Sequence, residues 1–136
     1  MTTPAANPTP GPVDAFLDAV AGATIPDTDA WASDAVLDAT VPNWRFRAHG
    51  DDAIRTEYAQ WFAAPAQFES LERTPLPDGE LVEYVLAWEE GGVPHAAHHL
   101  HRLRVRDDRI VADTVFCGGR WPATLLAEME EAGASS

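Results

Sequence analysis

The sequence has no lysine and only one cysteine, Cys117. The missing lysine excludes Schiff-base chemistry by a side chain. A lone cysteine excludes an intrachain disulfide and a cysteine-pair metal site. All nine basic side chains are arginine, and 22 acidic ones bring the formal net charge to -13 at pH 7. Nucleic acids and anionic membranes are bound by basic surfaces, so neither is expected as a partner.

The sequence also has no long apolar run. Nothing in it approaches the roughly 20 apolar residues of a membrane span, and no basic stretch followed by an apolar one opens it. We therefore expect a cytoplasmic protein. A chain of 136 residues predicts one domain. Residues 1–12 are rich in Pro, Thr and Ala and are expected to be a disordered tail, residues 13–132 the domain, and residues 133–136 a second disordered tail.

Apolar spacing predicts helices before strands. Apolar residues at helical spacing indicate a short helix from Val13 to Gly22 and a wider, aromatic one that begins at Gly50. A further helix is expected after Asp27, running through Trp31 and Ala35, because aspartate and threonine offer capping oxygens there. The remaining predictions are two strands and a terminal helix: Val36–Val41, Phe68–Thr74 and Thr124–Glu131.

The stretch from Leu81 to Cys117 predicts three antiparallel strands joined by tight turns at Gly91-Gly92 and Asp107-Asp108. Counting outward from the first turn sets Tyr84 opposite His99. Counting from both turns places one apolar, histidine-bearing set on a single face: Val82, Tyr84, Leu86, Trp88, His95, Ala97, His99, His101, Leu103, Val105, Ile110, Ala112, Thr114 and Phe116. A bulge near Pro94 or the acidic turn would change this sorting.

Helices followed by hairpin-paired strands are typical of an α+β domain whose sheet is covered on one face. We expect a cone-shaped, curved antiparallel sheet with helices packed on its concave face. The order of elements resembles the nuclear-transport-factor-two-like superfamily, a cystatin-like α+β barrel that includes SnoaL-like polyketide cyclases and ketosteroid isomerases. The resemblance rests on Pro42–Phe62, where Gly50–Ile54 is similar to a Gly-x-x-Ala-Ile helix start, and on Arg104–Asp113, which is similar to the final hairpin.

The resemblance implies a pocket between sheet and helices and a homodimer through the outer sheet face. Members of the superfamily isomerise, cyclise, dehydrate, hydrolyse or only bind ligands. The place of the isomerases' acidic donor falls near His101, whereas the place of their aspartate base falls at Val41-Pro42, where no carboxylate stands. Asp38 lies a few residues upstream of it. If the protein is an enzyme, a histidine is therefore the expected acid or base.

His99 and His101 are the candidate catalytic residues, because they lie two apart on the predicted inner face beside Tyr84. An imidazole exchanges protons near neutral pH, and an apolar wall favours its neutral form. Tyr84 is expected to orient the base or to donate to a developing oxyanion. The structural alternative is that both histidines are core residues, hydrogen-bonded to Tyr84, Thr114 or the backbone.

Asp113 is a reserve catalytic candidate. The predicted register turns it outward opposite Arg102, as a cross-strand ion pair, and only a bulge in the last hairpin would direct it into the pocket. The candidate ligand-binding residues are aromatic or lie beside the histidines: Trp44, Tyr58, Trp61, Trp88, Thr114 and Phe116. Five tryptophans in a small domain favour a hydrophobic small-molecule ligand.

No metal and no cofactor are expected. His99 and His101 can face one ion, but a third ligand is not identifiable, and neighbouring histidines on a strand point to opposite faces. Neither Gly91-Gly92 nor Gly118-Gly119 opens a helix as a phosphate loop does. The sequence thus predicts cofactor-independent acid–base chemistry on a hydrophobic metabolite, or alternatively a noncatalytic ligand-binding or dimeric assembly module.

Overall fold

The computed structural model describes residues 11–133, and it is an α+β fold built on one six-stranded sheet. The helices are α1 (Pro12–Gly22), α2 (Asp51–Trp61) and α3 (Ala123–Glu131), with a 3-10 turn, η2, at Ile25–Asp27. The strands are β1 (Trp31–Val41), β2 (Trp44–His49), β3 (Gln67–Leu76), β4 (Gly79–Glu90), β5 (Val93–Arg106) and β6 (Arg109–Pro122). This confirms the predicted fold class.

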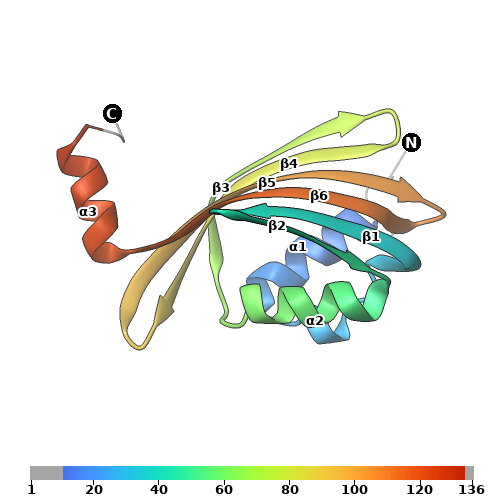
Figure 1. Ribbon diagram of the computed structural model, residues 1–136, viewed down its shortest axis with the longest axis horizontal. Helices are drawn as coiled ribbons and strands as arrows, with labels where there is room; N and C mark the ends of the chain where they lie inside the picture. The colour runs from blue at the N-terminus through green and yellow to red at the C-terminus, as the bar shows by residue number, and fades with distance from the viewer. Residues whose placement is uncertain (1–10, 134–136) are drawn as a thin grey trace, which may run out of the picture.

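The strand order is β2-β1-β6-β5-β4-β3, and every neighbouring pair is antiparallel except β1 and β6, which are parallel. The sheet is therefore mixed, whereas we predicted an antiparallel one. It curves strongly without closing, and α1 and α2 lie together on its concave side (Figure 1). The third helix differs from the prediction, because α3 lies at the far end of β6, away from both (Figure 1), and has no buried residue.

The core fills the space between the concave face and the two helices. Phe16 and Val20 of α1 and Ile54 and Tyr58 of α2 are fully buried against the sheet. Phe16 packs edge-on to Trp31 with ring centroids 5.4 Å apart. Burial of such side chains contributes roughly 1.5–3 kcal/mol each, so the amphipathic faces read from the sequence are what hold α1 and α2 in place.

The predicted β4–β5 register is confirmed along the whole hairpin, including Trp88 opposite His95 and Tyr84 opposite His99. Gly91 and Gly92 have φ of 57° and 80°, as the tight two-residue turn requires. Every residue of β4 and β5 that we placed on the inner face by counting from this turn therefore lies there.

The predicted β5–β6 register is wrong beyond its first two pairs. Arg106 pairs with Arg109 and Val105 with Ile110 as predicted, but a bulge then shifts β6 by one residue. Asp113 pairs with Leu103 and is fully buried on the inner face, so the predicted ion pair with Arg102 does not exist. Thr114 and Phe116 turn to the outer face, and the Phe116 side chain is 53% exposed.

Two other expectations need correction. The segment from Trp31 to Ala35 begins β1 and is not a helix; Trp31 and Ala35 are buried, while Ser33 and Asp34 between them are exposed. Most of the predicted N-terminal tail and the last three residues of the C-terminal tail lie outside the described residues. Of the residues expected in the N-terminal tail, Pro12 already begins α1. Asp14 accepts a hydrogen bond from the Gly11 amide at 2.9 Å. No helix in residues 11–133 has the length and apolar character to span a membrane.

Candidate functional site

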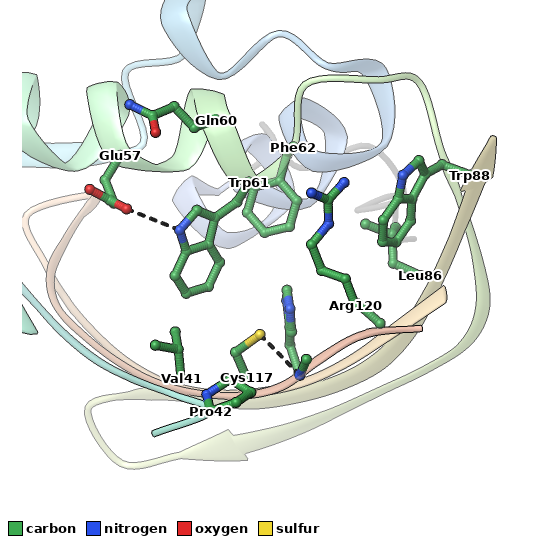
Figure 2. A pocket seen from close by; sticks show the side chains of 13 residues that line it. Val41, Pro42, Glu57, Gln60, Trp61, Phe62, Leu86, Trp88, Cys117 and Arg120 are labelled. Carbon is green, nitrogen blue, oxygen red and sulfur yellow. Dashed lines mark hydrogen bonds between the residues drawn. The ribbon is translucent and has the colours of Figure 1, made fainter. Parts of the chain in front are cut away.

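A cavity of about 440 Å³ opens between α2, the end of β1 and the inner face of β4, β5 and β6. Its walls are mostly apolar and aromatic. Trp61 and Phe62 come from the end of α2, and Leu86 and Trp88 come from β4 (Figure 2). The other lining residues are Val41, Pro42, Glu57, Gln60, Ala97, His99, Cys117, Gly119 and Arg120. Such a space suits an apolar small molecule.

His99 is the histidine that lines this cavity, and its side chain is otherwise enclosed, with the residue 4% exposed. Its ring packs edge-on against Trp61 and Phe62, with centroids 5.6 and 5.7 Å away. Its Nδ1 lies 3.0 Å from the hydroxyl oxygen of Tyr84. Within residues 11–133 only Trp31 Nε1 is a fully buried polar side-chain atom lacking a hydrogen-bond partner, so the unpaired Nε2 of His99 is open to the cavity.

Behind His99 runs a chain of buried hydrogen bonds. Tyr84 Oη also lies 2.9 Å from Nε2 of His101. The other ring nitrogen of His101, Nδ1, lies 3.0 Å from Oδ1 of Asp113, and Oδ2 of Asp113 accepts a 2.8 Å hydrogen bond from the Tyr58 hydroxyl. The four residues beyond His99 are fully buried, so the hydrogen bonds compensate polar groups that would otherwise be costly to bury.

Burial shifts the pKa of three groups in this chain. Burial, with the nearby Asp113, raises the pKa of Tyr84 and of Tyr58 well above the usual range of a tyrosine. Both phenols therefore keep one hydrogen each. Burial, followed by the neighbouring His101 and His98, lowers the pKa of His99 to about 3. His99 is thus a neutral imidazole at physiological pH, as the apolar wall predicted.

This low pKa makes the stability of the protein pH-dependent. His99 stays neutral when folded, whereas in the unfolded chain it takes up a proton below about pH 6.5. Its contribution to stability is therefore complete above that pH and is lost as the pH falls toward 3. Between pH 7 and pH 5 we expect the wild type to lose about 2 kcal/mol more than His99→Gln does.

Urea denaturation at the two pH values measures this difference. His49→Gln is the matched control, because His49 is an exposed histidine at the end of β2. It should show the same pH dependence as the wild type. An equal loss of stability in wild type and His99→Gln would show that His99 titrates normally in the folded protein.

The mouth of the cavity is polar but largely neutralised. The Arg120 guanidinium forms an ion pair with Glu90 and lies 5.2 Å from the centre of the Trp88 ring. Figure 2 shows Arg120 and Trp88 at one side of the opening and Glu57 at the other. Glu57 accepts a 3.1 Å hydrogen bond from the Trp61 indole. A carboxylate on the rim and a neutralised arginine disfavour anionic ligands.

Cys117 lies on the cavity floor, on β6, where it is the cross-strand partner of His99 on β5. Burial raises the pKa of its thiol, and its sulfur accepts a 3.4 Å hydrogen bond from the Gly119 amide. The thiolate is the reactive form of cysteine, so this residue is a neutral part of the wall.

The structure brings the four catalytic candidates together. His99, Tyr84 and His101 are joined as predicted on the inner face, and Asp113, the reserve candidate, joins them through the bulge in β6. His99 is the member of the group in contact with the cavity. The other three lie behind it as a supporting network.

Only some of the ligand-binding candidates line the cavity. Trp61 and Trp88 line the cavity. Tyr58 is a fully buried core residue bound to Asp113. Trp44 is 69% exposed, because β2 is an edge strand on which this residue points to solvent. The bulge turns Thr114 and Phe116 away, so the pocket contacts predicted for these two residues and for Trp44 are wrong.

Sequence reasoning missed several residues of the wall. Leu86 was placed on the inner face but not among the ligand contacts, and Phe62 and Arg120 were not predicted to line the cavity. Glu57 and Gln60 fall on the same side of α2 as Trp61, at i, i+3 and i+4 spacing, which is the signal that was available. Val41 and Pro42 reach the cavity only through the β1–β6 pairing, which no local pattern indicates.

A strongly curved sheet, a covering helix and an apolar cavity define the class of cone-shaped α+β pocket proteins. A protein from Catenulispora acidiphila with a ketosteroid isomerase-like fold, in complex with trimethylamine, is 20% identical with a TM-score of 0.62, over 88% of this chain and 92% of that one. A nuclear-transport-factor-two-like protein of unknown function from Mesorhizobium loti is 22% identical with a TM-score of 0.61, over 79% and 88%.

A candidate polyketide cyclase from Sinorhizobium meliloti is 28% identical with a TM-score of 0.52, over 76% of this chain and 92% of that one. No protein-family model matches the sequence, and no curated protein does either. The chain has the nuclear-transport-factor-two-like fold, which confirms the resemblance drawn from its sequence.

Proposed function

We propose that the protein binds an uncharged, mainly apolar small molecule in the cavity and exchanges a proton with it through Nε2 of His99. The observation that supports this is the contrast within the site. Most of the wall is aliphatic or aromatic, and one neutral imidazole nitrogen opens into it, backed by buried hydrogen bonds. A neutral histidine in such a wall is suited to act as a general base.

The reaction class is cofactor-independent acid–base chemistry, as in an isomerisation, cyclisation, dehydration or hydrolysis. The substrate would carry an acidic O–H or C–H group next to an apolar ring or chain. That polar end would meet His99 on the floor, while the apolar part would contact Trp61, Phe62 and Leu86. Glu57 on the rim disfavours a carboxylate or phosphate on the ligand.

A noncatalytic binding or assembly module is the second candidate, and two observations favour it. A structural neighbour was solved in complex with trimethylamine, and aromatic walls near a carboxylate, as Trp61 and Glu57 provide here, suit a small organic cation. Phe116 is exposed on the outer sheet face beside its cross-strand partner Leu100, which suits a homodimer formed through that face.

Native mass spectrometry of freshly purified protein tests these proposals together. We expect a dimer mass with a retained small molecule whose mass identifies it. In His99→Gln the molecule should still bind, because the apolar contacts remain, whereas turnover should fall by about 10²–10⁴-fold, the usual contribution of a general base. His49→Gln, at the exposed end of β2, is the control and should leave turnover unchanged.

Unaltered turnover in His99→Gln would overturn the catalytic proposal and leave the binding module. Trimethylammonium that displaces the retained molecule, with no turnover in the wild type, would favour the second candidate. A monomer mass would exclude the dimer.

A further inference from the structure

The hydrogen bonds behind His99 limit where protons can lie in the buried chain of side chains. The inference drawn from them rests on the proposed function of His99. Tyr84 has one hydroxyl hydrogen and two histidine nitrogens within hydrogen-bond distance, at 3.0 Å in His99 and 2.9 Å in His101. Its oxygen can donate to one nitrogen only and must accept from the other. Nδ1 of His99 and Nε2 of His101 therefore carry opposite protonation: when one has a hydrogen, the other has none.

The other end of the chain is fixed by the carboxylate. Oδ2 of Asp113 accepts from the Tyr58 hydroxyl, so Oδ1 is left to accept from Nδ1 of His101. With that nitrogen protonated, the group has two forms that differ by one proton. In the first, His101 is neutral, Tyr84 donates to it, and Nε2 of His99 is a free acceptor. In the second, His101 is an imidazolium ion and Nε2 of His99 bears a hydrogen.

We infer that His99, Tyr84, His101 and Asp113 form a proton relay, in which a proton taken up at Nε2 of His99 appears as a positive charge on His101 beside Asp113. The ligand O–H or C–H bond breaks and an N–H bond forms at Nε2. The hydrogen on Nδ1 of His99 passes to the Tyr84 oxygen, and the hydrogen of that hydroxyl passes to Nε2 of His101. His99 gains one hydrogen at Nε2 and loses one at Nδ1, the Tyr84 oxygen gains one and loses one, and no oxidant or metal takes part.

The relay explains how a histidine that resists protonation can still accept a proton. A cation on His99 would lie in an apolar wall with no carboxylate bound to its ring. On His101 the same charge lies 3.0 Å from Asp113. Tyr84, His101 and Asp113 are thus positioning residues, which act on the ligand only through His99.

Several elements pack against the two histidine rings. On His101, α1 contributes only the uncharged ring of Phe16, at 5.1 Å between centroids. The titratable or charged groups facing the relay are Tyr58 and Glu57 from α2, Tyr84 from β4, His98 from β5, and Asp113, Cys117 and Arg120 from β6. Asp113 is the acidic member of this set that bonds to His101.

Long-range proton–nitrogen NMR of histidine-labelled protein between pH 5 and 8, without ligand, tests the relay. The chain has five histidines; single glutamine variants at His49, His95 and His98 assign three of them, and His99→Gln distinguishes His99 from His101. In the wild type we expect His99 to move its hydrogen from Nδ1 to Nε2 at the pH where His101 becomes doubly protonated, with one shared midpoint. In Tyr84→Phe, His101 should titrate alone while His99 keeps one tautomer.

Tyr58→Phe is the matched control, because it removes a hydroxyl from the other end of the chain and leaves the relay intact. The shared midpoint should persist there and move to higher pH, since Asp113 loses a donor that stabilises its negative charge. A wild-type His99 that keeps one tautomer while His101 titrates would overturn the relay, even if Tyr84→Phe did not fold. Because no ligand is used, that result leaves the binding proposal standing, and failure to bind any ligand leaves the relay standing.

Discussion

Replacing Asp113 by alanine is expected to lower the free energy of unfolding by about 2–6 kcal/mol, since each of two buried donors left without an acceptor costs about 1–3 kcal/mol. The carboxylate is fully buried and accepts from His101 and Tyr58. Without it, two polar groups in the core lose their acceptor, and no solvent reaches them. Urea denaturation at pH 7 measures the loss.

The control for this change is Asp34→Ala. Asp34 also pairs with a basic side chain, Arg106, but its side chain is 71% exposed, so the loss should stay within about 0.5 kcal/mol. Asp113→Asn keeps one acceptor oxygen and should lie between the two. A loss below about 1 kcal/mol for Asp113→Ala would show that the carboxylate is not bonded as described.

Gly79→Ala is the second change with a large expected effect. A Cβ atom built on Gly79 would lie 1.8 Å from the carbonyl oxygen of Leu103 and 2.8 Å from its carbonyl carbon. These are backbone atoms in the middle of the sheet, so β4 and β5 must separate to admit a methyl group. Overpacking of this kind costs about 1–3 kcal/mol and occasionally more, and the upper end is expected here. Thermal unfolding and urea denaturation measure it.

Gly22→Ala is the matched glycine control. A Cβ atom at Gly22 would have the side chain of Thr24 as its nearest neighbour, at 3.7 Å, which is an ordinary contact, and Gly22 is the last residue of a helix. Alanine there should be neutral or stabilising by up to about 1 kcal/mol. Equal stability of Gly79→Ala and the wild type would mean that the strands are farther apart than described.

The parts of the fold that were predictable from sequence are those fixed by neighbouring residues. The β4–β5 register follows from the Gly91-Gly92 turn, because a two-residue turn leaves one pairing possible. Helices α1 and α2 follow from apolar spacing. These two signals suffice to join Tyr84 to His99 and to place His101 on the same face.

The rest depends on contacts between distant segments. The bulge in β6 falls at Val111-Ala112. Both residues are apolar and fit either face of a sheet, so the local sequence pattern does not indicate that the register shifts there. What accompanies the bulge is remote in sequence: the Val105 amide donates to the Asp78 carbonyl at 2.8 Å, and Gly79 packs on the backbone of Leu103. The parallel pairing of β1 with β6 is equally non-local, which is why Trp31–Ala35 was predicted as a helix.

The bulge in β6 also suggests how such a fold diversifies. The same chain paired without that bulge would keep both hairpin turns and every side chain, yet it would present Thr114 and Phe116 to the interior in place of Asp113 and Cys117. The interior would then lose its carboxylate without a single substitution. In this sheet the register of a strand, as much as the identity of its residues, selects the chemistry available inside.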